Sequence, residues 1–170
     1  MDWILLILLF LHVAGAVLAF GPTFTFPILG PMAGREPPHV NFALRFQQRV
    51  ASILIVPLAL FQGVTGLLLV FRLADIQDVS FIDVIARGWL LTAIVLYVVA
   101  LALTFGIGLP TLRTLIEATS APPPPPPPGG EAPHGPPPHI AALVRRGRTV
   151  GMIQSALILV IIFLMVTKPF

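Results

Sequence analysis

Four long runs of apolar residues alternate with shorter polar or proline-rich stretches along the 170-residue chain. The runs cover about 3–21, 50–71, 89–109 and 150–167. A helix of about 20 residues rises about 30 Å, which matches the hydrocarbon core of a bilayer. The pattern therefore predicts an all-α protein, a transmembrane four-helix bundle built as a single membrane domain over residues 1–170.

Prolines interrupt or bend two of these runs. Pro22 and Pro27 follow the first run, and a proline lacks the amide hydrogen and clashes with the preceding helical turn. We therefore expect the first helix to kink or stop there, and we expect Pro57 to bend the second helix. The first two connections are then expected to be loops over 30–46 and 72–88.

A proline-rich linker over 120–139 separates the third run from the fourth. It contains seven consecutive prolines, Pro122 to Pro128. Such a tract forms neither a helix nor a packed core, and it favours an extended polyproline II conformation. We interpret it as a semi-rigid spacer. Docking on an aromatic-lined partner is the alternative.

Composition and charge support a membrane protein. Hydrophobic residues make up 56% of the chain and charged residues only 10%. The chain contains no cysteine, which excludes disulfides and thiolate metal ligands. Its net charge of +3 comes from basic residues beside the apolar runs. The expected partner is therefore the lipid bilayer, and no nucleic acid is expected.

The basic residues are distributed unevenly between the two sides of the predicted bundle. The side with the first and third loops carries seven arginines, and the side with both termini carries three cations. The positive-inside rule then predicts both termini outside and loops one and three in the cytoplasm. The seven arginines are Arg35, Arg45, Arg49, Arg113, Arg145, Arg146 and Arg148, and the three cations are Arg72, Arg87 and Lys168.

His12 is the one ionisable residue inside the first run. A helix that starts near Trp3 places it about 13 Å into the membrane, and a titratable side chain at that depth marks a candidate functional site. Gly15, Ala16 and Ala19 share its helical face. This stripe of small residues leaves room for another helix or for a flat ligand against the imidazole. The alternative is that His12 only forms a hydrogen bond to a neighbouring helix.

Two further polar residues lie inside predicted spans. Gln62 shares a helical face with Ala59, Gly63 and Gly66, and we expect the two glycines to lie against another helix. Tyr97 lies in the third run, where its hydroxyl has two interpretations. We expect it to bond to a backbone carbonyl rather than to a bound ligand.

Short motifs in all four runs resemble a group of bacterial membrane proteins. They are Leu11-His12, Pro27, the stretch RFQQRV before the second run, Gly63-x-x-Gly66, the GWL that opens the third run, and Lys168-Pro169-Phe170. The group includes the haem-containing protoporphyrinogen oxidase, copper-resistance protein D and uncharacterised predicted integral membrane proteins of four spans. The resemblance implies a location in the bacterial inner membrane.

The resemblance also implies a role for His12 as axial ligand of a b-type haem. The oxidase carries a histidine and a lysine after its GWL motif, whereas this chain reads Leu91-Thr92-Ala93 there. This departure argues against oxidase activity. Since neutral imidazole binds iron well, His12 remains the candidate metal ligand, and Arg45 or Arg49 would pair with the haem propionates.

Two classes of function follow from these observations. The first is a non-enzymatic accessory or assembly bundle, which acts as a homodimer or within a larger membrane complex. The alternative is a membrane protein that binds haem b or a porphyrin through His12 and is redox-active. No second histidine lies inside a predicted span, so a second axial ligand would come from a loop histidine that folds inward or from His12 of another copy.

Overall fold

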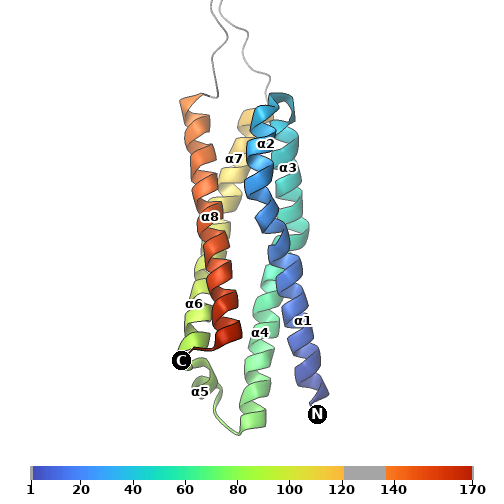
Figure 1. Cartoon of the computed structure of the whole chain (residues 1–170), viewed down its shortest axis with the longest axis vertical. Helices are drawn as coiled ribbons and strands as arrows, with labels where there is room; N and C mark the ends of the chain where they lie inside the picture. Colours follow the sequence, from blue (N-terminus) through green and yellow to red (C-terminus); the bar gives the residue numbers. More distant parts are fainter. Residues whose placement is uncertain (1, 121–136, 170) are drawn as a thin grey trace, which may run out of the picture.

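The chain folds into four long helical rods that lie side by side and run alternately up and down (Figure 1). The computed structural model describes residues 2–120 and 137–169. Each rod is long and apolar enough to cross a membrane, and the described part contains no strand. The predicted all-α four-helix bundle is therefore confirmed. The rods are Trp3–Arg35, Pro37–Gln77, Gly88–Ser120 and Pro138–Thr167.

Three of the four rods contain an irregular turn near the middle of their length. The first rod consists of α1 (Trp3–Phe20), the 3₁₀ turn η1 (Gly21–Thr25) and α2 (Phe26–Arg35). The second consists of the 3₁₀ turn η2 (Pro37–His39), α3 (Val40–Val50), the π turn η3 (Ala51–Ile55) and α4 (Val56–Gln77). After the short helix α5 (Phe81–Ile85) come α6 (Gly88–Leu103), the π turn η4 (Thr104–Gly108) and α7 (Leu109–Ser120), and the fourth rod is α8 (Pro138–Thr167).

A proline accompanies each of these mid-rod turns. Pro22 lies inside η1, and Pro57 and Pro110 lie two residues beyond the ends of η3 and η4. Because proline cannot donate its helical hydrogen bond, a local 3₁₀ or π turn lets the helix continue. The expected break at Pro22 is confirmed, because α1 ends at Phe20 and η1 follows it. The expected second break at Pro27 is wrong, since α2 runs through it and the rod continues to Arg35. Pro27 lies in the first turn of α2, where its missing amide hydrogen has little cost.

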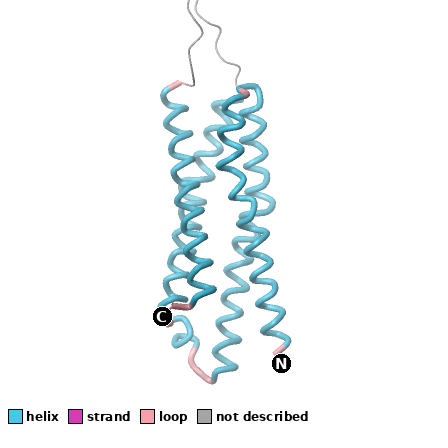
Figure 2. Tube along the Cα trace, in the orientation of Figure 1, coloured by secondary structure: helices cyan, strands magenta, loops and turns pink. Residues whose placement is uncertain are grey.

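The connections between the rods are shorter than predicted. The expected loop over 30–46 is wrong, because only Glu36 and η2 separate α2 from α3. In the second connection, α4 extends to Gln77 and α5 occupies part of what remains. Figure 2 shows that the loops gather at the two ends of the bundle. Most of the predicted linker 120–139 lies outside the described residues, and the membrane boundaries within the rods stay predictions.

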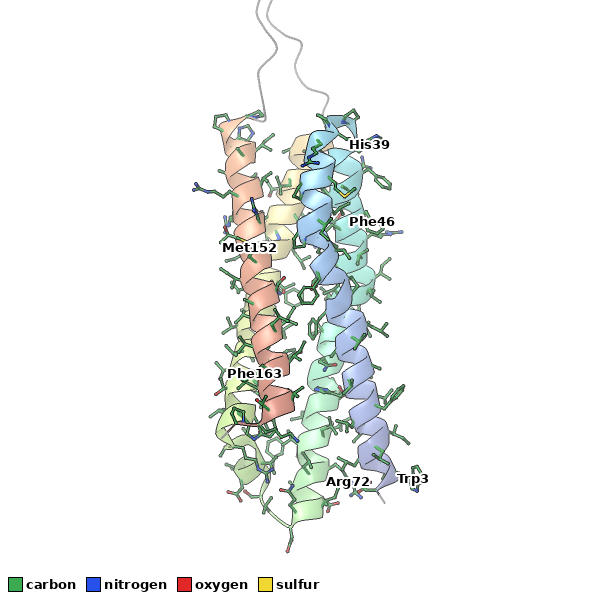
Figure 3. All side chains as sticks on the ribbon, viewed as in Figure 1. Trp3, His39, Phe46, Arg72, Met152 and Phe163 are labelled. Atoms are coloured by element: carbon green, nitrogen blue, oxygen red, sulfur yellow. The ribbon has the colours of Figure 1, made fainter. Side chains whose placement is uncertain are left out.

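Small residues are buried between the rods, whereas large apolar residues face outward. Ala19 is 0% exposed and Ala93 is 1% exposed, while Phe10 is 69% exposed and Val17 is 65% exposed. This arrangement is typical of membrane bundles, because lipid is as apolar as leucine and small residues let helix backbones approach. Figure 3 shows apolar side chains projecting along the outside of all four rods, with Trp3 at the end near the N-terminus.

The irregular turns divide the described bundle into two halves. The terminal half, which carries both ends of the chain, comprises residues 2–20, 56–103 and 155–169 (Figure 1). The arginine half comprises residues 21–55, 104–120 and 137–154. A hydrophobic cluster closes the terminal half, where Lys168 also lies over the ring of Trp89 at 5.6 Å from its centroid. The buried members of the cluster are Val70, Ala74, Val84 and Leu90.

Candidate intramembrane site around His12

His12 lies in the contact between α1 and α4 and bonds to a buried threonine. Its Nδ1 is 2.9 Å from Oγ1 of Thr65, which is only 2% exposed. The Thr65 hydroxyl is also 3.0 Å from the carbonyl oxygen of Phe61 on its own helix. A hydroxyl has one proton, and we assign it to the carbonyl, which can only accept. His12 then donates from Nδ1, and its Nε2 keeps the lone pair.

Helix α4 packs against the stripe of small residues beside His12. A Cβ atom added to Gly15 would lie 2.9 Å from Oε1 of Gln62, and one added to Gly66 would lie 3.1 Å from Cε1 of His12. Ala19, one turn beyond Gly15, is fully buried. The sequence leaves room on this face for either another helix or a flat ligand, and in the structure a helix lies there. The prediction that Gly66 lies against another helix is confirmed.

Two acceptor atoms near this contact have no hydrogen-bond partner among the described residues. Oε1 of Gln62 is buried and unpaired, which costs about 1–3 kcal/mol for a neutral polar group. Nε2 of His12 likewise has no partner in the described part of the chain. An imidazole nitrogen with a lone pair can bind a metal ion or accept a proton. The site therefore supplies one ligand atom, on a histidine whose other nitrogen is held by Thr65.

Tyr97 joins the third rod to the second. Its hydroxyl donates to the carbonyl oxygen of Ala59 at 2.8 Å, so the expected bond to a backbone carbonyl is confirmed. The ring lies against Gly63, where an added Cβ would be 2.7 Å from the phenolic oxygen. The prediction that Gly63 lies against another helix is therefore also confirmed.

Two amide side chains that the sequence did not single out as functional join the remaining neighbours. Gln154 on α8 donates from Nε2 to the carbonyl oxygen of Ala100 at 3.1 Å and also contacts the hydroxyl of Thr104. Asn41 on α3 donates to the carbonyl oxygen of Ile116 on α7 at 3.0 Å. A lone amide in an apolar helix was the available signal for Gln154, because such groups seek partners on neighbouring helices. Asn41 lies in the polar helix α3, where no such signal marks it.

The structure does not bring Arg45 and Arg49 to His12. Both are exposed on α3, and Nε of Arg45 donates to Oδ1 of Asn41 at 2.6 Å. At 1.5 Å per residue, Arg49 lies about 24 Å and Arg45 about 30 Å along the second rod from Thr65. One macrocycle at His12 does not extend that far. The described residues also contain no group of three or more metal-binding side chains.

An ion pair closes the terminal end of the same helix pair. Asp2 accepts from the backbone amide of Leu5 at 3.0 Å, and Nη2 of Arg72 is 2.6 Å from its carboxylate. Arg72 also contacts Asp75. The amide of Leu5 and then the guanidinium of Arg72 lower the pKa of Asp2 below its ordinary value, since both favour the charged form.

Comparison with known proteins gives one match. A family model described as "Predicted integral membrane protein (DUF2269)" matches residues 6–169. No curated protein matches the chain. No solved structure matches it either.

Proposed function

Because the chain belongs to the DUF2269 family of predicted integral membrane proteins, we propose that it is a non-enzymatic accessory or assembly subunit of a membrane complex. In this role the bundle offers its outer helix faces to other membrane proteins. Its internal polar groups then serve to hold its own rods together and carry out no reaction.

The observation that carries this proposal is that the intramembrane polar side chains bond to neighbouring rods of the same bundle. With the exception of Gln62, whose side-chain oxygen has no partner among the described residues, each one described above crosses to a neighbouring rod, and its partner there is in most cases a backbone carbonyl. Such bonds stabilise membrane bundles by about 0.5–2 kcal/mol each. A catalytic site would instead gather several of these groups around one open cavity. The crossing residues are His12 to Thr65, Tyr97 to Ala59 and Gln154 to Ala100, and Asn41 makes the same kind of bond to Ile116 at the arginine end, outside the predicted spans.

Native electrophoresis of the tagged protein, solubilised from its own membrane in a mild detergent, tests the proposal. We expect a complex larger than a homodimer, with partner proteins at fixed stoichiometry by mass spectrometry. Deleting the gene should lower the abundance of those partners. A protein that migrates as a monomer, and whose loss leaves every other membrane protein at its normal level, would contradict this function.

A second function, the binding of haem b or a porphyrin, is favoured by one specific observation. Nδ1 of His12 is 2.9 Å from the Thr65 hydroxyl oxygen, and with the proton assigned to Nδ1 the Nε2 atom keeps its lone pair. A ligand histidine fixed in this way is typical of metal sites. The described residues fit a single axial ligand but not a pocket, since α4 covers the small-residue stripe. In this function His12 of a second copy would complete the ligand set in a homodimer.

An absorbance spectrum of protein expressed with added haem separates the two functions. The accessory function predicts no Soret band. The haem function predicts a band that His12→Ala and His12→Gln both remove, because neither side chain is a good iron ligand. Thr65→Val is the matched control, since it removes the hydrogen bond to His12 but leaves the ligand atom in place. A band that survives His12→Ala would exclude His12 as the ligand.

A further inference from the structure

The seven arginines of the arginine half have no carboxylate partners among the described residues. The described ion pairs are His39 with Glu36, and Arg72 with Asp2 and with Asp75. The described acids of this half are Glu36 and Glu117. Seven guanidinium groups are thus accompanied by two carboxylates among the described residues, so this end of the bundle carries an excess of positive charge that favours anionic ligands.

Two of these arginines line a groove between the third and fourth rods. The groove has a volume of about 280 Å³ and is open to the outside of the bundle. Its polar wall consists of Arg145, Arg146 and Thr149, which share one face of α8. Ile107 of η4 forms its apolar wall together with Ala142 and Val150 of α8. The guanidinium groups thus lie directly beside an apolar surface.

The length of the third rod and its anchoring residues predict that the groove lies at one membrane interface. Lys168 over Trp89 marks the opposite interface, because aromatic and basic residues anchor helices at the headgroup level. Ile107 follows Trp89 by about 27 Å of helix, close to the 30 Å thickness of a hydrocarbon core. Arg145 and Arg146 precede Met152 on α8 by about two helical turns, in the part of the helix that belongs to the arginine half.

We propose that this groove binds an anionic phospholipid of the surrounding bilayer. Arg145 and Arg146 hold the headgroup phosphate, for which planar guanidinium groups are suited by their paired N–H donors. The Thr149 hydroxyl adds a third donor, and the first acyl chain lies over Ile107 and Val150. A basic pocket beside an apolar wall at the interface has the chemistry of a lipid headgroup site.

Lipid titration followed by native mass spectrometry tests this site on the full-length protein in detergent. The probes are phosphatidylglycerol and phosphatidylcholine with identical acyl chains. We expect at least tenfold tighter binding of phosphatidylglycerol to the wild type. The double variant Arg145→Gln with Arg146→Gln should lose that preference. The control Arg35→Gln with Arg113→Gln has the same net charge and should keep it.

A second variant separates the groove from general charge. Ala142→Trp fills the groove without altering any charge, and it should also weaken phosphatidylglycerol binding by about the same factor. Inorganic phosphate should displace the lipid poorly, since it lacks the acyl chain. The proposal is overturned if the wild type shows no preference for the anionic lipid, if both double variants lose it equally, or if Ala142→Trp binds normally.

Discussion

The terminal half and the arginine half of the bundle differ in whether their arginines pair with carboxylates. In the terminal half, Arg72 bonds to Asp2 and Asp75, and Arg87 bonds to the side-chain oxygen of Gln77. In the arginine half, the described residues include no carboxylate paired with an arginine. Charge in the terminal half is therefore compensated inside the chain. The arginines of the arginine half have no carboxylate partner among the described residues, so their charge is available to groups outside the chain.

Close contacts between the rods follow the same division. A Cβ atom added to Gly15, Gly63 or Gly66 in the terminal half would lie within 2.7–3.1 Å of another rod's side chain. At Gly21 and Gly106 in the arginine half, an added Cβ would meet nothing within 4 Å. The comparison teaches that the terminal half is specified by its own packing. The arginine half also buries residues between its rods, among them Ala43, Thr111 and Leu112, but a Cβ atom added to its described glycines would approach another rod's side chain no closer than 3.8 Å.

The largest expected effect is a reporter signal that shows which half of the bundle faces the cytoplasm. The excess of arginines predicts that the arginine end faces the cytoplasm of a bacterial cell, with both termini outside. A reporter active only in the periplasm and inserted at Gly129 should be inactive, and a reporter active only in the cytoplasm should be active there. The same pair of reporters fused after Phe170 should give the opposite result. Periplasmic activity at Gly129 would reverse the assignment of the two halves.

The four-rod fold was predictable because apolar run length alone determines how many helices cross a bilayer. The continuity of the rods was not, because the effect of a proline depends on whether its neighbours can form a 3₁₀ or π turn. Pro22, Pro57 and Pro110 are each accommodated in this way. A sequence shows the missing hydrogen bond and does not show its local compensation.

The positions of His12, Gly66 and Tyr97 between rods were predictable from the sequence, but their partners and the separation of Arg45 and Arg49 from His12 were not. His12, Gly66 and Tyr97 stand out as lone polar or small residues in apolar runs, and all three lie between rods. That Thr65 bonds to His12 depends on the register between α1 and α4, which the sequence does not specify. The same register separates Arg45 from His12 by most of the bundle's length.

Leucine substitutions at one glycine of each half test the packing difference between the halves. Gly66→Leu adds a side chain where the His12 ring already lies, and overpacking of this kind costs about 1–3 kcal/mol. The control is Gly151→Leu, at an exposed helical position with nothing within 4 Å of an added Cβ. It should be neutral or slightly stabilising, because leucine favours a helix more than glycine does. If both variants unfold at the same temperature in detergent, the two halves do not differ in how tightly their rods pack at these glycines.

Loss of the His12 hydrogen bond should have a smaller effect. Thr65→Val keeps the volume of the side chain but removes the oxygen that His12 contacts, and we expect a loss of about 0.5–2 kcal/mol. Thr92→Val is the matched control, since its exposed hydroxyl bonds only to the carbonyl oxygen of Gly88 on its own helix. Chemical denaturation in mixed micelles measures both variants. A control that loses as much as Thr65→Val would show that the interhelical bond contributes nothing to stability.

The smallest expected effect is the pH dependence of the Asp2–Arg72 pair. The pKa of Asp2 is lowered in the folded protein, so its charged form favours folding. This stabilisation is fully present above the ordinary aspartate pKa of about 3.9 and is lost as the pH falls through the lowered value. Thermal unfolding should therefore place the wild type above Asp2→Asn at pH 6, and the gap should narrow toward pH 2–3. If the gap between the wild type and Asp2→Asn is the same at both pH values, the paired charge is not what stabilises the terminal end.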